Sequence, residues 1–267
     1  MKVIEDLKSW QERYKRYQEP STGDDIGKDY PFIENKVAPF TPARRALPML
    51  NLALISSAGA YIDGTTPFNS DLKGGDTSFR EIPIEVEADD LKYAARGYNP
   101  EAVLEDMNAQ IPIQRLLEYE ANNVIGQLNP VWWSFSGFIP DAGKLAADLI
   151  PNLVERVVRY EVQAALLIPA SRLCHQSIAL VARAIEFANI PTMMLAVDRD
   201  IVESVRPPRA GLYSGEFGSV AGKPNWPEYQ RRVLDEALRL IEPIEQPTIR
   251  RLVVNLESEV EQERGEK

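Results

Sequence analysis

The only cysteine and the only histidine of the chain are adjacent, as Cys174 and His175. They separate an apolar run, "VQAALLIPA", from "CHQSIALVARAIEFAN", so the pattern predicts a buried strand that leads into a helix. At a helix N-terminus, free backbone N–H groups and the helix dipole favour a thiolate, which is the reactive form of cysteine. We therefore predict that Cys174 is catalytic; the alternative is a small buried residue without chemistry.

His175 is a less direct partner than its position suggests. Consecutive helical side chains point about 100° apart, so those of Cys174 and His175 are not expected to meet. We predict a catalytic role for His175 in substrate contact or proton transfer; the alternative is that it caps the helix. A usual zinc site needs more histidine or cysteine than this, so no metal is predicted. The chain has no GxSxG, P-loop or GxGxxG motif, and no cofactor is predicted.

Five further polar residues are candidates for substrate binding. Arg80, in "GGDTSFREIP" with Asp76, could fork onto a substrate carboxylate, although a surface salt bridge is the alternative. Asn108, in "EDMN", could position a substrate amine or could simply be solvated on a helix. Ser136 stands at the end of "WWSFSG", and Ser57 stands in "LISSAGAY", where each strand is expected to give way to a loop.

The elements that must position these residues alternate between apolar strands and amphipathic helices. This order predicts an α/β fold of the Rossmann or flavodoxin-like type, with a mostly parallel sheet and helices on both faces. In such folds, ligands bind beyond the carboxyl ends of the strands. We expect three strand-end loops, 56–64, 134–141 and 169–177, to converge there. Residues 198–227, rich in proline and glycine, are predicted to be one long loop.

Three parts of the chain are expected. Residues 1–48 form an N-terminal helix followed by an extended, proline-rich arm, which either lies along the body or a partner subunit or tethers the helix. Residues 49–245 form the α/β domain. Residues 246–267 are a charged C-terminal tail.

Composition limits the classes of partner. The 267 residues carry a formal net charge of −10, with a pI of about 4.9. That charge argues against nucleic acid and anionic membranes, which attract basic surfaces. No apolar run approaches the roughly 18–20 residues of a membrane span, and the N-terminus lacks a signal-peptide core. One cysteine excludes an intramolecular disulfide framework, and we expect a cytoplasmic protein, which could form a homo-oligomer.

Several segments between residues 48 and 243 together resemble a known family. They are "LALISSAGAYIDGTTPFN", "GGDTSFREIP", "GYNPEAVLEDMNAQIPIQRLLEYEANNVIGQLNP", "FSGFIPD" and the strand, loop and helix at 164–193. In their order and spacing, the chain resembles the selenoprotein B component of the glycine, sarcosine and betaine reductases and the related D-proline reductases. It is most similar to shorter homologues without selenocysteine.

The resemblance implies reductive cleavage of a carbon–nitrogen bond next to a carboxylate, so the expected substrate is a small amino or ammonium carboxylate. Reducing equivalents would come from an external thiol or a redox partner protein. The family nucleophile lies in a pattern like U-x-x-C-x-x-C, whose positions fall here on Ser171, Cys174 and Ser177. Serine at the first position leaves Cys174 as the nucleophile and Ser171 as a substrate-binding candidate. The alternatives are a non-catalytic binding or scaffold homologue and a cysteine-dependent hydrolase or lyase.

Overall fold

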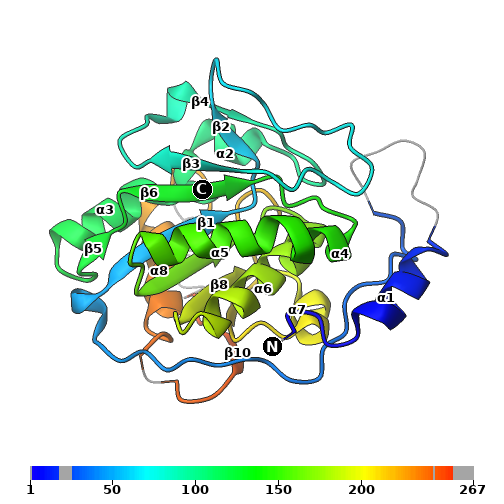
Figure 1. Ribbon diagram of the computed structural model, residues 1–267. Coiled ribbons are helices and arrows are strands. Elements are labelled where there is room, and N and C mark those ends of the chain that lie inside the picture. Colours follow the sequence, from blue (N-terminus) through cyan, green and yellow to red (C-terminus); the bar gives the residue numbers. More distant parts are fainter. Residues whose placement is uncertain (1, 18–25, 243, 255–267) are drawn as a thin grey trace, which may run out of the picture.

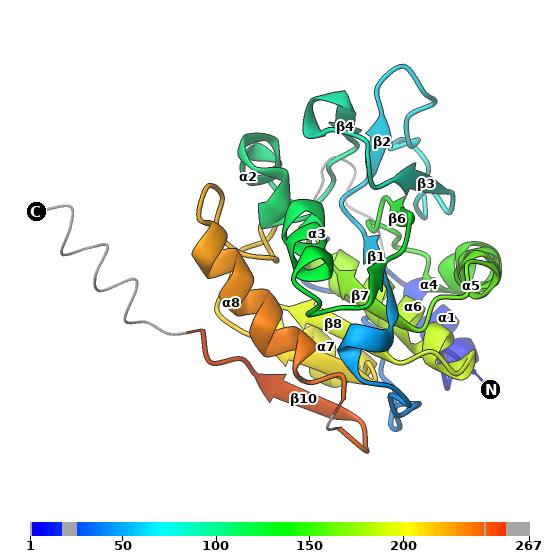
Figure 2. The same cartoon turned by 90° about the vertical axis from the view of Figure 1, so that its left-hand side faces the viewer.

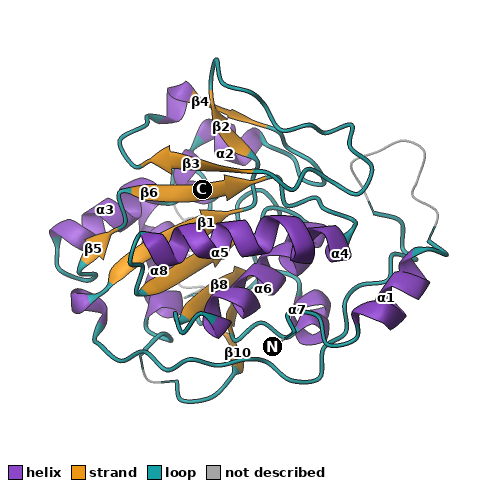
Figure 3. Ribbon diagram, viewed as in Figure 1, coloured by secondary structure: helices purple, strands orange, loops and turns teal. Residues whose placement is uncertain are grey.

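A computed structural model describes residues 2–17, 26–242 and 244–254 of the protein. Its central sheet has the strand order β10-β9-β8-β7-β1-β6-β3, and the short β5 pairs with β1 (Figure 1 and Figure 3). All neighbours in this sheet are parallel except β3, which runs antiparallel to β6. The strands are β1 (Asn51–Ser56), β3 (Phe79–Pro83), β5 (Gln127–Leu128), β6 (Val131–Phe135), β7 (Ala164–Ile168), β8 (Thr192–Ala196), β9 (Arg209–Leu212) and β10 (Thr248–Arg251).

Helices cover both faces of the sheet, as Figure 2 shows from the edge. One face carries α1 (Leu7–Tyr14), α4 (Ala142–Lys144), a π-helical turn (Leu145–Leu149), α5 (Ile150–Arg159), α6 (Arg172–Phe187) and α7 (Arg199–Val205). The other carries α2 (Glu101–Glu105), α3 (Ile113–Ala121) and α8 (Pro227–Leu238). The predicted fold class, a mostly parallel α/β sheet with helices on both faces, is therefore confirmed.

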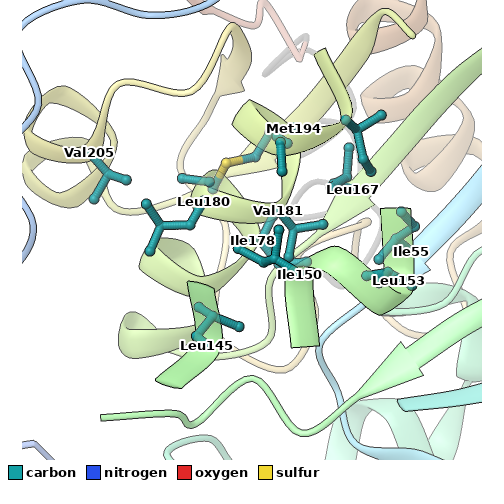
Figure 4. Packing of buried hydrophobic residues seen from close by; sticks show 14 of the residues in the cluster. Ile55, Leu145, Ile150, Leu153, Leu167, Ile178, Leu180, Val181, Met194 and Val205 are labelled. Atoms are coloured by element: carbon teal, nitrogen blue, oxygen red, sulfur yellow. The ribbon is translucent and has the colours of Figure 1, made fainter. Parts of the chain in front are cut away.

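The apolar strands do not alternate with polar residues because both sheet faces are covered. Every residue of β7 and β8 is buried. Figure 4 shows how Ile178 and Val181 of α6 pack near Ile150 of α5 and Leu167 of β7. Helix α6 is buried from Leu173 to Glu186, on its polar as well as its apolar positions.

The N-terminal arm lies along the body of its own chain. Trp10 of α1 is buried, and the backbone N–H of Ile33 donates to Gln176 Oε1 of α6 at 2.7 Å. Farther along, Arg183 donates to the carbonyl oxygen of Val37 at 2.8 Å. The arm thus covers α6 along its length, and part of the predicted arm, residues 18–25, lies outside the described residues.

Two regions differ from the secondary structure expected from the sequence. The predicted loop 198–227 is wrong in its first half, which forms α7 and β9. The side chain of Asp198 accepts the Ile201 N–H at 3.1 Å and starts α7, and the buried β9 follows two prolines, which made it look like a loop. Residues 248–251, placed in the charged tail, pair with β9 as β10; residues 255–267 lie outside the described residues.

Two short elements stand apart from the main sheet. Strands β2 (Ala60–Ile62) and β4 (Leu91–Tyr93) pair antiparallel. The backbone joins them to the end of the sheet, because the Gly59 N–H donates to the carbonyl oxygen of Phe135 at 3.0 Å. No helix among the described residues is both long and apolar enough to cross a bilayer.

Candidate functional site at the carboxyl edge of the sheet

The strand order places the carboxyl ends of β6, β1 and β7 next to one another, and the loops that follow them meet at Ser57. The Ala170 N–H donates to Ser57 Oγ at 3.1 Å, and the Gly137 N–H donates to the Ser57 carbonyl at 3.1 Å. Ser177 Oγ of α6 donates to the Gly137 carbonyl at 2.7 Å. The predicted convergence of loops 56–64, 134–141 and 169–177 is therefore confirmed.

Ser171 begins helix α6 as its N-cap. Its Oγ accepts the Cys174 N–H at 3.2 Å, and its carbonyl accepts the His175 N–H at 3.2 Å. Serine is favoured at this position because its hydroxyl satisfies an N–H that the helix leaves without a partner. The N–H groups of Cys174 and His175, in the first turn of α6, are thus engaged within the chain.

The Cys174 thiol lies at the centre of this junction, and the residue is 1% exposed. The Ser171 hydroxyl donates to Cys174 Sγ at 2.9 Å, and the thiol donates to the Ser57 carbonyl at 3.7 Å. Gly137 closes the other side: a Cβ at that position would lie 2.8 Å from Sγ and 2.4 Å from Ser57 Cβ. Cys174 also belongs to the buried apolar cluster on this face of the sheet, so its surroundings combine polar and apolar groups.

The expectation that the helix N-terminus would favour the thiolate is wrong for this arrangement. Burial raises the pKa of Cys174 above its ordinary value, and the hydrogen bonds of Ser171 and Ser57 lower it by less. A charged sulfur here would lose its solvation, and that cost exceeds what the hydrogen bonds return. Burial at this position therefore favours the protonated thiol over the thiolate.

His175 is fully buried and tied to the backbone on both sides of its ring. Nδ1 lies 2.7 Å from the Ser171 carbonyl, and Nε2 lies 3.1 Å from the Val197 backbone nitrogen, which donates to it. Nδ1 must therefore carry the proton. Burial lowers the pKa of His175 to about 4, so the ring is neutral near pH 7. These bonds join the start of α6 to the end of β8.

A second layer of residues, which the sequence did not indicate, covers the thiol. The Tyr98 hydroxyl donates to the Ala58 carbonyl at 2.7 Å. Burial, followed by the proximity of Cys174, raises the pKa of Tyr98. The Gly218 N–H donates to the Ala170 carbonyl at 2.9 Å. The ring of Phe217, which is 40% exposed, meets His175 edge to face at 5.6 Å.

Gln110 is another residue of this layer that the sequence analysis did not single out. It is fully buried. Its Nε2 donates to the Pro169 carbonyl at 3.0 Å, while its Oε1 accepts the Val220 N–H at 3.0 Å. Gln110 thus ties the loop after β7 to the loop after β9, so movement of one loop must disturb the other.

Arg80 and Asp76 organise a neighbouring loop. Arg80 donates to Thr66 O at 3.1 Å and to Ser78 Oγ at 3.0 Å, and its guanidinium lies 4.2 Å above the ring of Phe68. Burial raises the pKa of Asp76, but hydrogen bonds from Ser78 and the Asn69 backbone lower it by more. Arg80 of β3 pairs in the sheet with Ser134 of β6, so that β6 lies between Arg80 and β1. Their proposed contact with substrate stays a prediction.

Asn108 and the serines of β6 occupy different environments. Asn108 Nδ2 donates to Asp106 Oδ1 at 3.1 Å and to Gln114 Oε1 at 3.0 Å, so the side chain closes the turn before α3. Ser136, which is 6% exposed, forms a backbone bridge with Ala58 and so lies at the junction. The Ser134 hydroxyl is buried without a hydrogen-bond partner among the described residues. Of the predicted substrate-binding residues, Ser57, Ser171 and Ser136 are gathered here.

Comparison of the sequence with known proteins shows the family of this chain. The chain belongs to the family of D-proline reductase and glycine reductase gamma subunits. It is 30% identical over 214 residues to the D-proline reductase subunit gamma of Acetoanaerobium sticklandii, covering 80% of this chain and 86% of that protein.

A second relative extends the similarity to the glycine reductases. The chain is 25% identical over 174 residues to the glycine reductase complex component B subunit gamma of Symbiobacterium thermophilum. That match covers 64% of this chain and 40% of that protein. No protein-family model matches the chain, and no solved structure matches it.

Proposed function

We propose that this chain is a subunit of a cytoplasmic, thiol-dependent reductase that cleaves a carbon–nitrogen bond in a small amino or ammonium carboxylate. Cys174 supplies the sulfur nucleophile. The observation that carries the proposal is the position of the only thiol in the chain: it lies where the loops after β6, β1 and β7 meet, 2.9 Å from the Ser171 hydroxyl. Membership of the reductase family supports the reaction class.

The proposed reaction has two covalent steps. The Cys174 thiolate forms a bond to the substrate α-carbon, and the electron pair of the carbon–nitrogen bond leaves with the amine, which takes a proton. A second thiol then attacks Sγ, and the carbon–sulfur electron pair leaves with the substrate carbon, which also takes a proton. The disulfide left on Cys174 is reduced by an external dithiol or a redox partner protein, so two thiols are oxidised for each amine released.

Burial sets a condition on this reaction. A thiol that is 1% exposed and has a raised pKa must be uncovered and deprotonated before it can attack. The neighbouring loop after β9 is held by the backbone contact from Gly218 to Ala170, and its exposed Phe217 lies against the ring of His175; we infer that this loop covers the thiol. We propose that a partner subunit contacts Phe217, displaces this cover and completes the site, because both relatives are named as subunits.

The other predicted site residues differ in how closely they could contact the substrate. Ser57 and Ser171 contact Cys174, and Ser136 precedes Gly137 at the same junction; all three would contact the substrate when the cover opens. His175 acts as a positioning residue, since both ring nitrogens are bound to backbone groups. Arg80 would reach a substrate carboxylate only after leaving its bonds in loop 66–80.

The test combines turnover with thiol reactivity. The full chain, assembled with the partner subunit that completes the site, is incubated with a dithiol and candidate glycine or proline derivatives, and amine release is measured for the wild type and for Cys174→Ala. We expect release only with the wild-type chain, only with the dithiol and only with the partner subunit, and faster alkylation of Cys174 by iodoacetamide in the assembled complex than in the isolated chain. Equal turnover by Cys174→Ala would contradict the proposal, and turnover without any thiol would indicate a hydrolase or lyase instead.

A second candidate, a non-catalytic subunit that binds a small acid, is favoured by one specific observation. Ser171 occupies the position where the family pattern has its nucleophile, and the remaining thiol is buried and protonated. Binding of a small carboxylate that is unchanged in Cys174→Ala, together with no amine release and no alkylation below denaturing conditions, would support this candidate over the reductase.

A further inference from the structure

A cavity near the loop after β9 has the chemistry of a cation site. Its volume is about 630 Å³, and it lies between α2, the loop after β9 and the first turn of α8. Figure 2 shows α2 and the start of α8 on the same side of the sheet. The bond from Asn225 Nδ2 to Glu105 Oε1, 2.7 Å long, joins the two walls. The cavity therefore belongs to the carboxyl edge of the sheet but is distinct from the Cys174 junction.

Two aromatic rings in this cavity lie next to the ammonium group of a lysine. The rings of Trp226 and Tyr229 lie 5.1 Å apart, tilted by 33°. Lys223 Nζ lies 5.3 Å from the centre of the first ring and 5.4 Å from the second. Both distances fall within the range of about 6 Å over which an ammonium is attracted to a ring face. The exposed ammonium of Lys223 thus shows where a cation is stable in this cavity.

The charged groups that line the cavity favour the same kind of ligand. Its lining includes the carboxylates of Glu101, Glu105 and Glu216, against the single ammonium of Lys223. Glu105 accepts from Asn225 and Glu101 accepts from Asn99, so both carboxylates are held in place at the wall. An anion at the start of α8 would face these carboxylates, and Pro227 removes one N–H from that helix start.

We propose that this cavity binds the ammonium group of a small organic cation, which replaces Lys223 on the rings of Trp226 and Tyr229. The carboxylates of Glu101, Glu105 and Glu216 supply the countercharge. The site adjoins the cover of Cys174, because Ser219 lines the cavity and the preceding Gly218 donates to Ala170. It stands independently of the reductase proposal.

Isothermal titration of the full chain with choline tests the proposal, with the neutral isostere 3,3-dimethylbutan-1-ol as the uncharged probe. We expect choline to bind and the alcohol to bind at least tenfold more weakly. Trp226→Ala should weaken choline binding by about two- to thirtyfold, the range that loss of a cation–π contact gives. Trp226→Phe keeps a ring and should retain most of the affinity, which covers the case in which the alanine variant does not fold.

The decisive variant is Lys223→Ala. Removing the internal cation should tighten choline binding at least about twofold, because Lys223 no longer competes for the two rings and one repulsive charge is lost. Lys8→Ala removes an equal charge from α1, on the opposite face of the sheet, and should leave binding unchanged. Weaker choline binding in Lys223→Ala, binding of acetate in place of choline, or equal binding of the alcohol would each overturn the proposal.

Discussion

The two ends of helix α6 bury polar side chains in different ways. At the N-terminal end, Cys174 and His175 are neutral, and each is held by backbone or hydroxyl groups. At the C-terminal end, Arg183 and Glu186 are ionisable and buried: Arg183 holds the arm, and Glu186 pairs with Arg209, whose side chain is also fully buried.

The two ends of α6 differ in how much free energy it costs to expose their buried polar groups. A buried charge is tolerated only when its partners are fixed, so the C-terminal end of α6 cannot move without a large cost. The neutral groups at the N-terminal end cost less to expose, because only hydrogen bonds must be exchanged with water. The end of α6 at the carboxyl edge of the sheet is therefore the one suited to open around a reactant.

The largest effect on stability is expected from removing the ion pair at the C-terminal end of α6. Arg209→Met removes the 2.6 Å ion pair to Glu186 Oε1 and the 2.6 Å bond to the Thr41 carbonyl. Burial raises the pKa of Glu186 to about 7 even beside Arg209, so without Arg209 the carboxyl must either stay charged with no countercharge or take up a proton. The free energy of unfolding should therefore fall, by up to about 3–5 kcal/mol in a urea titration. Arg199→Met is the control, because its pair with Glu203 is exposed and should cost below about 1 kcal/mol. Equal losses in the two variants would remove the contrast between the ends.

At the N-terminal end of α6, His175 should make the stability of the protein depend on pH. The pKa of His175 is lowered from 6.5 to about 4 by burial, so the unfolded chain binds this proton more readily than the folded one. The stability that comes from keeping the ring neutral is present above about pH 6.5 and is lost as the pH falls towards 4. The loss approaches about 3 kcal/mol, from roughly 1.4 kcal/mol per pKa unit.

Because the chain has a single histidine, this dependence can be isolated. Urea unfolding at pH 7.0 and pH 5.0 should show a fall in stability for the wild type that His175→Gln largely removes. Carboxyl groups that titrate in the same range remain in both proteins and so cancel. A histidine ring signal in the proton NMR spectrum that titrates near pH 6.5 would contradict the burial of both nitrogens.

Packing around the thiol gives a smaller effect. In Gly137→Ala, the new methyl group would lie within 3 Å of both Ser57 and Cys174 Sγ, so the loop must shift at a cost of about 1–3 kcal/mol. The same shift should expose the sulfur and speed its alkylation by iodoacetamide. Reduced stability with unchanged alkylation would mean that the loop after β6 does not control access to Cys174.

The framework of the fold could be predicted from the sequence because the buried strands and the long helices have clear patterns. The apolar runs predicted β7 and β8. The convergence of loops 56–64, 134–141 and 169–177 follows from the strand order. Strand β9, only four residues long and preceded by two prolines, has no such pattern. Strand β10 was missed for a similar reason: its "TIRR" reads as charged tail and is stabilised by pairing with β9.

The candidate site was predicted in part. The positions of Ser57, Ser171 and Ser136 beside Cys174 follow from the turns that hold them. The burial of the thiol does not, because it depends on Tyr98 and Gly218, which come from segments distant in the chain. A helix-start cysteine looks the same in the sequence whether solvent or another loop lies above it, so its protonation state required the packed structure.

The smallest effect on stability is expected at Ser171, which stands at the first position of the family pattern. In Ser171→Cys, the new sulfur would take the place of Oγ, 2.9 Å from Cys174 Sγ, and a small shift brings two sulfurs to the roughly 2.05 Å of a disulfide. Closing so short a loop should stabilise the oxidised protein by on the order of 1 kcal/mol. Non-reducing mass spectrometry and Ellman titration measure the bond. Ser177→Cys is the control, since its Oγ is directed to the Gly137 carbonyl, and it should keep two free thiols. If both variants, or neither, form the disulfide, then the N-cap position has no special relation to Cys174, and the neutral end of α6 is not arranged for sulfur chemistry.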